Sequence, residues 1–124
     1  MGKSTRIMSR QAHVQFRLRI VTAGEIAVGP GKVDLLEAVA ATGSITAAAK
    51  QLGMSYRRAW LLVDTMNRCF KEPLTTAEAG GKRGGGTSLT PLGGEVVKRY
   101  RRIEARSAKA GATDIRALQA LLSR

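Results

Sequence analysis

The sequence has few of the residues that build disulfides, metal sites and catalytic centres. Its 124 residues include one cysteine, Cys69, and one histidine, His13. A single cysteine excludes an internal disulfide framework and fits a reducing cytoplasm, and Cys69 is predicted to be a small packing residue. One histidine and one cysteine cannot build a zinc site in a single chain. Because no Ser/His/acid arrangement has supporting context either, we expect no enzyme and no cofactor.

Long apolar segments are also absent. No uninterrupted apolar run approaches the roughly 18 residues that a membrane span needs. The basic N-terminus leads into VQFRLRIV, which arginines interrupt, so the sequence does not predict a secretory signal. We therefore expect a cytoplasmic protein without a membrane partner.

Acidic residues are scarce relative to basic ones. The chain has 9 Asp and Glu against 21 Lys and Arg, which gives a formal net charge of +12. This excess favours polyanionic partners such as DNA, RNA or an acidic membrane face. Residues 1–24 hold five basic and no acidic side chains. We predict a flexible basic tail over residues 1–13, which acts either as an extra phosphate-binding arm or as a solubilising leader.

The apolar spacing next predicts a β-hairpin and a helix. Residues 14–21, VQFRLRIV, alternate apolar and polar side chains, which is typical of a strand with one solvated face. TAGE is a predicted turn, and residues 26–29 are the candidate return strand. A helix is predicted from Pro30 to about residue 42, and its apolar residues are expected to lie on one face. These residues are Val33, Leu36, Val39 and Ala40.

Two further helices are separated by a tight turn. Gly43 can end the preceding helix in the left-handed conformation, and Ser44 can cap a short helix over residues 45–52. Ser55 is a second predicted cap, for a helix over residues 56–70. Short helices joined by a glycine-containing turn indicate a helix-turn-helix. The apolar stripe expected on the second of them is Ala59, Leu62, Val63, Met66 and Phe70.

The remaining sequence predicts a wing and C-terminal helices. Residues 73–77 can pair with residues 87–90, and the loop between them carries Lys82 and Arg83 among glycines. Thr90 and Pro91 are typical of a helix start, and we expect a helix over residues 92–109. Thr113 is the predicted cap of a final helix. The spacing of Val96, Tyr100, Ile103, Ser107 and Ala110 along the longer helix indicates a short heptad seam.

The first turns of the helix over residues 56–70 carry SYRRAW. In a helix-turn-helix, these turns reach base edges in the major groove of DNA. Arg57 and Arg58 can present a guanidinium to guanine or phosphate, and Ser55 and Tyr56 supply hydroxyls for phosphate. Trp60 can pack on sugar and phosphate, and Leu61 is expected to be exposed.

Plainer interpretations stay open at this stage. The two arginines also suit a solvated helix face, and Trp60 also suits a half-buried core position. The segment GGKRGGGTS lacks the GxxxxGK[ST] spacing of a nucleotide-binding loop, so the wing interpretation is preferred. Glycine amides or a dimer cleft could still hold a small oxyanion, which keeps an oxyanion sensor as an alternative.

The segments LLEAVAATGSITAAAKQLGMSYRRAWLLVDTMN and GGKRGGGTSLTPLG carry a resemblance to a known family. From Gly29 to about Arg106 the chain resembles the N-terminal DNA-binding domain of ModE-type molybdate-responsive transcription regulators. The helix-turn-helix part is more distantly similar to the LysR type. The resemblance implies an α+β, mostly α, winged helix-turn-helix over residues 14–90. It also implies C-terminal helices over residues 91–124 that form a homodimer.

The resemblance also implies which residues approach double-stranded DNA and which mediate dimerisation. The DNA-binding set is Ser44, Thr46, Ser55, Tyr56, Arg57, Arg58, Trp60, Lys82 and Arg83. The dimerisation set is Val96, Val97, Tyr100 and Ile103. Full-length members sense molybdate through C-terminal oxyanion-binding domains, for which a chain ending at Arg124 leaves no room. Molybdate sensing is therefore not inherited, and the chain is either a stand-alone form or a fragment.

We therefore expect a sequence-specific transcription regulator that binds a palindromic operator as a dimer. It would be cytoplasmic and associated with the nucleoid. A separate effector or sensor protein is a possible further partner. The main alternative is a basic protein that binds nucleic acid without sequence preference.

Overall fold

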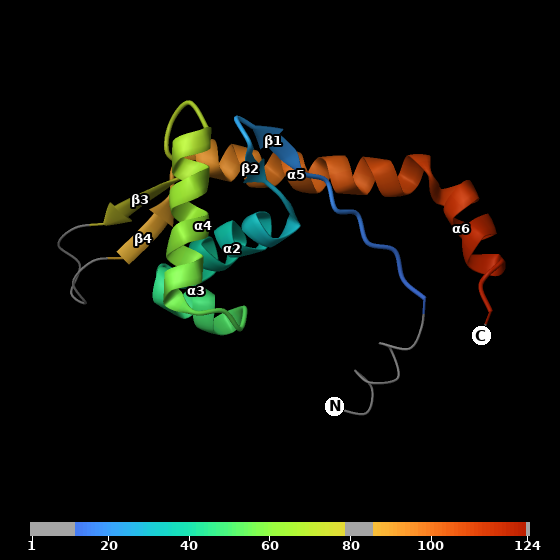
Figure 1. Cartoon of the computed structure of the whole chain (residues 1–124), viewed down its shortest axis with the longest axis horizontal. Coiled ribbons are helices and arrows are strands. Elements are labelled where there is room, and N and C mark those ends of the chain that lie inside the picture. Colours follow the sequence, from blue (N-terminus) through green and yellow to red (C-terminus); the bar gives the residue numbers. More distant parts are fainter. Residues whose placement is uncertain (1–11, 79–85, 124) are drawn as a thin grey trace. The chain divides into compact units, whose positions relative to one another are not determined.

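The computed structural model describes residues 12–78 and 86–123, which form short strands and helices of a mostly helical α+β fold (Figure 1). Residues Arg17–Arg102 make one compact unit, and the described residues before and after them belong to a second unit. The elements are β1 (Ile20–Thr22), β2 (Glu25–Val28), α2 (Pro30–Thr42), α3 (Ile45–Gln51), α4 (Tyr56–Cys69), β3 (Thr75–Glu78), β4 (Gly86–Leu89), α5 (Pro91–Ala110) and α6 (Ala112–Ala120).

The N-terminal hairpin is shorter than predicted. Ala23 and Gly24 both have positive φ angles, of 49° and 77°, which suits the tight turn between antiparallel strands β1 and β2. The prediction of a strand over residues 14–21 is wrong for residues 14–19, because β1 begins only at Ile20. β2 ends at Val28, and α2 begins two residues later, so residues before Ile20 find no partner in this sheet. Alternating hydrophobicity alone cannot supply the missing hydrogen bonds.

Helix α2 lies at the centre of the first unit. Its ends are as predicted: Pro30 occupies the first turn, and Gly43 follows the helix with a φ of 75°. The buried arc includes Leu35 and Ala38 as well as the predicted valines and Leu36, because α2 packs against α3, α4 and β4. Ala40, predicted to be on the apolar face, is exposed at the edge of this arc.

The helix-turn-helix of α3 and α4 is confirmed. The Ser44 hydroxyl accepts a hydrogen bond from the Ala47 amide at 3.0 Å, and the Ser55 hydroxyl accepts one from the Arg58 amide at 3.1 Å. Gly53 takes a φ of 70° in the turn between the helices. Close packing of the helices depends on small side chains that are fully or almost fully buried. They are Ala48, Ala49 and Ala59.

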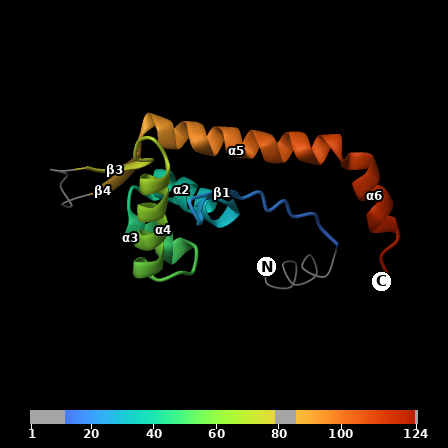
Figure 2. The ribbon, with the colours of Figure 1, turned by 45° about the horizontal axis from the view of Figure 1, so that its top comes forward.

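The wing strands β3 and β4 are joined to the helices by backbone and side-chain hydrogen bonds. In both views the hairpin projects away from α2, α3 and α4 (Figures 1 and 2). The register pairs Thr75 with Leu89. The Thr87 amide donates to the Gly43 carbonyl at 2.9 Å, which attaches β4 to the end of α2. The Asn67 side chain of α4 accepts from the Leu74 amide at 2.8 Å, so β3 is attached to α4.

Helix α5 begins in close contact with the wing. The Thr90 hydroxyl accepts from the Gly93 amide at 3.0 Å and donates to the Pro73 carbonyl at 2.8 Å, which confirms Thr90 as the cap. By contrast, Thr113 does not cap the final helix. α6 begins at Ala112, one residue before Thr113, and its cap position is Gly111, which has no side chain to accept a hydrogen bond.

Gly93 permits the closest approach between α5 and the wing. A Cβ atom added at Gly93 would lie 2.1 Å from the Leu74 carbonyl oxygen, whereas one at Gly94 would meet nothing within 4 Å. We therefore expect Gly93→Ala to lower the free energy of unfolding by at least ~1–3 kcal/mol, because the Leu74 backbone must move.

Gly94→Ala provides the matched control. It should leave the unfolding free energy unchanged or raise it by up to about 1 kcal/mol, because alanine is the better helix former. Urea unfolding of both variants, followed by circular dichroism, measures the difference. Equal stability of the two variants would contradict the close contact at Gly93.

Candidate nucleic-acid interface

The first turns of α4 expose a mixed aromatic, basic and apolar surface. Tyr56, Trp60 and Leu61 are 53%, 46% and 45% exposed, and Arg57 is exposed beside them. These four residues line a shallow depression. Almost half of the Trp60 surface is in contact with solvent, and Trp60 is not among the hydrophobic residues that pack against the core clusters of the described chain. The predicted exposure of Leu61 is confirmed.

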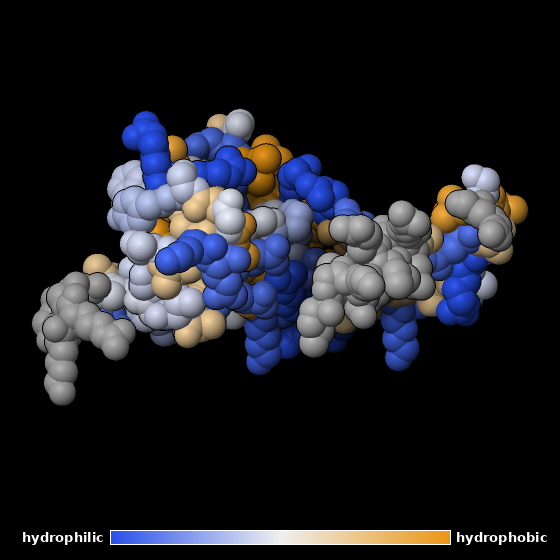
Figure 3. Space-filling model, turned by 90° about the horizontal axis from the view of Figure 1, so that it is seen from below, coloured by the Kyte–Doolittle hydropathy of each residue, from blue (hydrophilic) through white to orange (hydrophobic). Residues whose placement is uncertain are grey.

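Arg58 contributes to a different part of the surface. It lines a second depression together with Lys32 of α2 and with Arg17 and Arg19, which lie before and at the edge of the N-terminal hairpin. Adjacent arginines at the start of α4 therefore belong to separate surfaces. Figure 3 views the chain from the side of the α3–α4 turn and shows hydrophilic side chains, in blue, projecting from this side.

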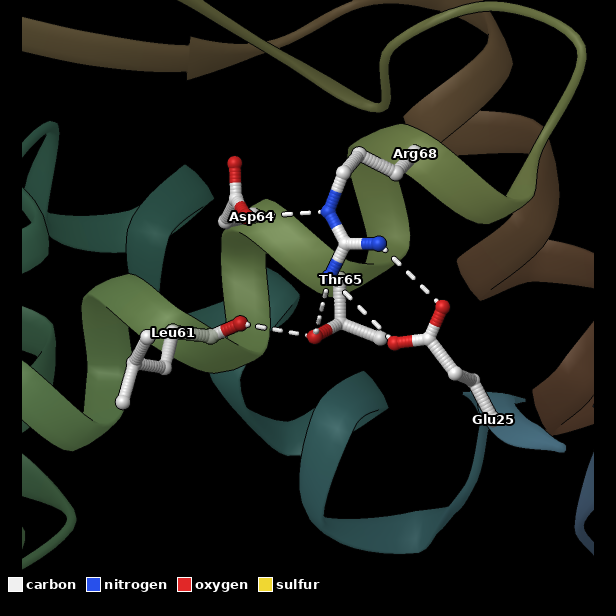
Figure 4. Close-up of polar contacts among 5 residues, drawn as sticks. All are labelled: Glu25, Leu61, Asp64, Thr65 and Arg68. Atoms are coloured by element: carbon white, nitrogen blue, oxygen red, sulfur yellow. Dashed lines mark hydrogen bonds and ion pairs between the residues drawn. The ribbon is translucent and has the colours of Figure 1, made fainter.

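The described acidic residues that form ion pairs are bound to other arginines. Arg68 near the end of α4 pairs with Asp64 at 3.0 Å and with Glu25 at 3.1 Å, and it also contacts the Thr65 hydroxyl (Figure 4). The hydrogen bonds that Arg68 donates to Glu25 and Asp64 raise the pKa of Arg68 further above its usual range. Arg68 is thus held by its own chain, and it fastens α4 to the N-terminal hairpin.

Arg57 and Arg58 take part in none of these ion pairs. Among residues 12–78 and 86–123, no carboxylate forms an ion pair with either guanidinium. Both arginines therefore remain available to an external anion, and an arginine fork suits both guanine edges and phosphate.

The serine and threonine residues predicted to contact DNA lie at the starts of α3 and α4. Ser44 and Ser55 use their hydroxyl oxygens as helix caps, which leaves each hydroxyl hydrogen available for donation. Thr46 is exposed at the second position of α3. Lys82 and Arg83 lie outside the described residues, so only the strands that lead to them, β3 and β4, are described.

The predicted dimerisation residues have different surroundings. Val96 and Val97 are partly buried against the core of their own chain, and Ile103 is exposed. Tyr100 is only 3% exposed, and its hydroxyl donates to the Leu18 carbonyl at 2.8 Å. Tyr100 is thus a core residue of its own chain and not an exposed position of the heptad seam, because the segment before β1 covers it.

A known protein family matches just over half of this chain. The family described as bacterial regulatory helix-turn-helix protein, lysR family, matches residues 31–94, which is just over half of the 124 residues. The chain belongs to this family. The match covers α2, α3, α4, the wing strands and the start of α5.

Curated relatives confirm the resemblance to ModE-type regulators. The chain is 48% identical over 82 residues to the molybdenum-pterin-binding protein MopB of Rhodobacter capsulatus, covering 66% of this chain and 30% of the relative. It is 43% identical over 88 residues to the molybdenum transport protein ModE of Azotobacter vinelandii, covering 71% and 33%. For the DNA-binding transcriptional dual regulator ModE of Escherichia coli K12 the identity is 38% over 71 residues, covering 57% and 27%. The chain thus spans about a third of these relatives.

Residues 12–78 and 86–123 lack both a membrane-spanning helix and a cluster of metal ligands. No helix there is long and apolar enough to cross a bilayer. Nor do three or more His, Cys, Asp or Glu side chains gather there as a possible metal site.

The sequence interpretation missed several residues of this surface. In the sequence, Lys32 has no feature that distinguishes it from other residues near a helix start. It lies beside Arg58 because α2 packs against α4. Arg17 and Arg19 were recognised only as polar positions of a strand. Asn67 carried no local signal, because its hydrogen bonds reach residues seven and eight positions later in the chain.

The ion pairs of Arg101 generate a prediction about pH. Arg101 contacts Asp34 at 2.6 Å and Glu37 at 2.7 Å, and its hydrogen bond lowers the pKa of Glu37. A carboxylate whose pKa is lowered by folding stabilises the fold above its unfolded pKa, and this contribution is lost as the pH falls through the folded value. Arg101→Gln should therefore cost ~0.2–1 kcal/mol per pair at pH 7, because these pairs are solvent-exposed.

The cost of Arg101→Gln should become smaller at a pH below the lowered pKa of Glu37, where this carboxylate is protonated and no longer pairs with the guanidinium. Urea unfolding at both pH values measures it. Arg102→Gln is the control, because Arg102 forms no ion pair with a described carboxylate. A loss of stability that is the same at both pH values would mean that Arg101 acts through packing.

Proposed function

We propose that this chain is a transcriptional regulator of the ModE type that recognises double-stranded DNA through α4. The observation that carries the proposal is the exposed start of α4, where Arg57, Trp60 and Leu61 lie together and no described carboxylate pairs with Arg57. Membership of a regulatory helix-turn-helix family supports the same assignment. It would act in the cytoplasm on nucleoid DNA and without catalysis.

In this proposal α4 enters the major groove with its N-terminal end first. Arg57 donates to the O6 and N7 atoms of a guanine, and Leu61 contacts a thymine methyl group. Trp60 packs against sugar and phosphate. The hydroxyls of the caps and of α3, together with Lys82 and Arg83 of the wing, bind phosphates beside the groove. The hydroxyl contacts are assigned to Ser44, Thr46, Ser55 and Tyr56.

We further propose that the chain binds DNA as a homodimer through its C-terminal helices. α6 exposes Leu118, Leu121 and Leu122, and α5 exposes Ile103. These residues, with the partly buried Val96 and Val97, offer apolar surface to a second copy. Two α4 helices related by a two-fold axis would address half-sites about one helical turn, ~34 Å, apart. Because the chain spans about a third of its relatives, the proposal is confined to DNA recognition.

Selection from a random duplex pool tests the proposal directly. We expect a two-fold symmetric consensus and a preference of at least ~10³ for that duplex over random DNA in a competition assay. Sedimentation of the complex should give two chains per duplex. A preference near one would favour the alternative, a general nucleic-acid binder, which the net charge of +12 also suits.

Arg57→Ala tests the assignment of the base contact. The change should weaken binding to the selected duplex by ~1–3 kcal/mol and relax the sequence preference at one position of each half-site. Fluorescence anisotropy with duplexes altered at single positions measures both effects. Arg102→Ala on α5 is the control, because it removes the same charge outside the proposed contact. Unchanged preference in Arg57→Ala would show that another residue reads the bases.

A further inference from the structure

A basic cleft lies beside the proposed DNA-reading turn of α4. It has a volume of about 240 Å³, and its lining comes from the segment before β1, from β2, from the start of α2, from the α3–α4 turn and from one side of α4. Its apolar lining includes Ile26, Met54 and Leu62. Its charged lining is entirely basic and consists of Arg17, Arg19, Lys32 and Arg58.

The four basic side chains are not neutralised within the described part of the chain. None of them forms an ion pair with a described carboxylate. Burial lowers the pKa of Lys32, and the charges of Arg58 and Arg19 lower it further. Cys69 and Glu25 act in the opposite direction, but Glu25 is bound to Arg68. An anion in the cleft would therefore relieve repulsion that the folded chain leaves uncompensated.

Contacts outside the cleft hold its walls in place. The Arg68–Glu25 pair fastens the start of β2 to α4 (Figure 4). The Tyr100 hydroxyl holds the Leu18 carbonyl, between Arg17 and Arg19. The Cγ atom of Arg19 also lies only 3.3 Å from where a Cβ atom at Gly29 would be. The cations are thus brought together by the fold before any ligand is present, which reduces the entropic cost of binding.

Arg58 connects this cleft to the reading surface. Arg57 lines the depression with Trp60 and Leu61, whereas Arg58, one residue later, lines the basic cleft. An α4 helix placed in a major groove would therefore bring the cleft towards the strand that borders the groove. Four cations that line one cleft beside the groove suit the negative charge of a phosphodiester, whereas Arg57 alone at the helix start can reach a base edge.

We propose that Arg17, Arg19, Lys32 and Arg58 bind a backbone phosphate of the DNA strand that borders the groove occupied by α4. This inference rests on the proposed function. It separates the two arginines of α4 by role: Arg57 reads sequence, and Arg58 supplies affinity that does not depend on sequence. The N-terminus of α2 adds a favourable field, but the four side chains carry the interaction.

Salt dependence distinguishes a phosphate contact from a base contact. Lys32→Gln and Arg19→Gln would each be compared with the unaltered chain on the selected duplex and on a random duplex. Each variant should reduce the slope of log K against log salt by about 0.9, because one fewer counterion-releasing contact forms. Near 0.1 M salt, affinity for both duplexes should fall roughly eight- to ten-fold, and the preference between them should stay unchanged.

Lys98→Gln and Arg102→Gln are the matched controls. They remove the same charges from α5, outside the cleft, and should leave the slope unchanged. Thermal unfolding followed by circular dichroism checks the fold of all four variants. Lys32→Gln should melt no earlier than the unaltered chain, because folding disfavours the Lys32 ammonium.

The outcomes separate this inference from the proposed function. If the unaltered chain prefers no duplex, the proposed function fails and this inference fails with it. If the chain selects a duplex and the cleft variants keep its full salt slope, only the cleft assignment fails. Loss of sequence preference in Lys32→Gln would overturn it in favour of base reading.

A free oxyanion is the other source of the same chemistry. Inorganic phosphate and molybdate would each be titrated into the chain by calorimetry at millimolar concentration. Saturable binding that Lys32→Gln abolishes, combined with an unchanged duplex salt slope, would overturn the DNA assignment. Absence of heat, combined with the reduced slope, supports the DNA backbone as the ligand.

Discussion

The close approach of three segments at Gly43 is the constraint on which the remainder of the domain depends. Gly43 takes the left-handed conformation that ends α2, and the following residue caps α3. Its carbonyl also accepts the Thr87 amide of the wing. A Cβ atom at Gly86 would lie 3.0 Å from this carbonyl, so a side chain there would crowd the contact between β4 and the end of α2. The direction of α3 and the position of the wing are therefore determined at one peptide unit.

The few acidic residues have a structural use that leaves the start of α4 positively charged. Glu25 and Asp64 hold Arg68, and Asp34 and Glu37 hold Arg101. The other described basic side chains near the start of α4 have no such partners. A surface of this kind attracts a polyanion at a distance and is weakened by salt. The excess of basic over acidic residues is thus expressed locally, at the start of α4.

The sequence predicted what local chemistry determines. Ser44, Ser55 and Thr90 cap helices as expected, because a hydroxyl at the cap position bonds an amide three residues later. What depends on a distant partner was predicted less well. The alternation of residues 14–19 predicts a strand, but no described strand pairs with these residues. Tyr100 was assigned to a heptad seam, whereas its hydroxyl donates to the Leu18 carbonyl, 82 residues earlier. The basic cleft needed three separate elements and had no contiguous motif.

The side chain of Asn67 has a mechanical consequence. Its oxygen accepts the amides of Leu74 and Thr75, and its nitrogen donates to the Thr75 hydroxyl at 3.1 Å. The side-chain amide of Asn67 thus joins the C-terminal part of α4 to the start of β3. A change in the orientation of α4 would therefore also move β3. In the proposed complex, the positions of α4 and of β3 on the duplex would therefore be coupled.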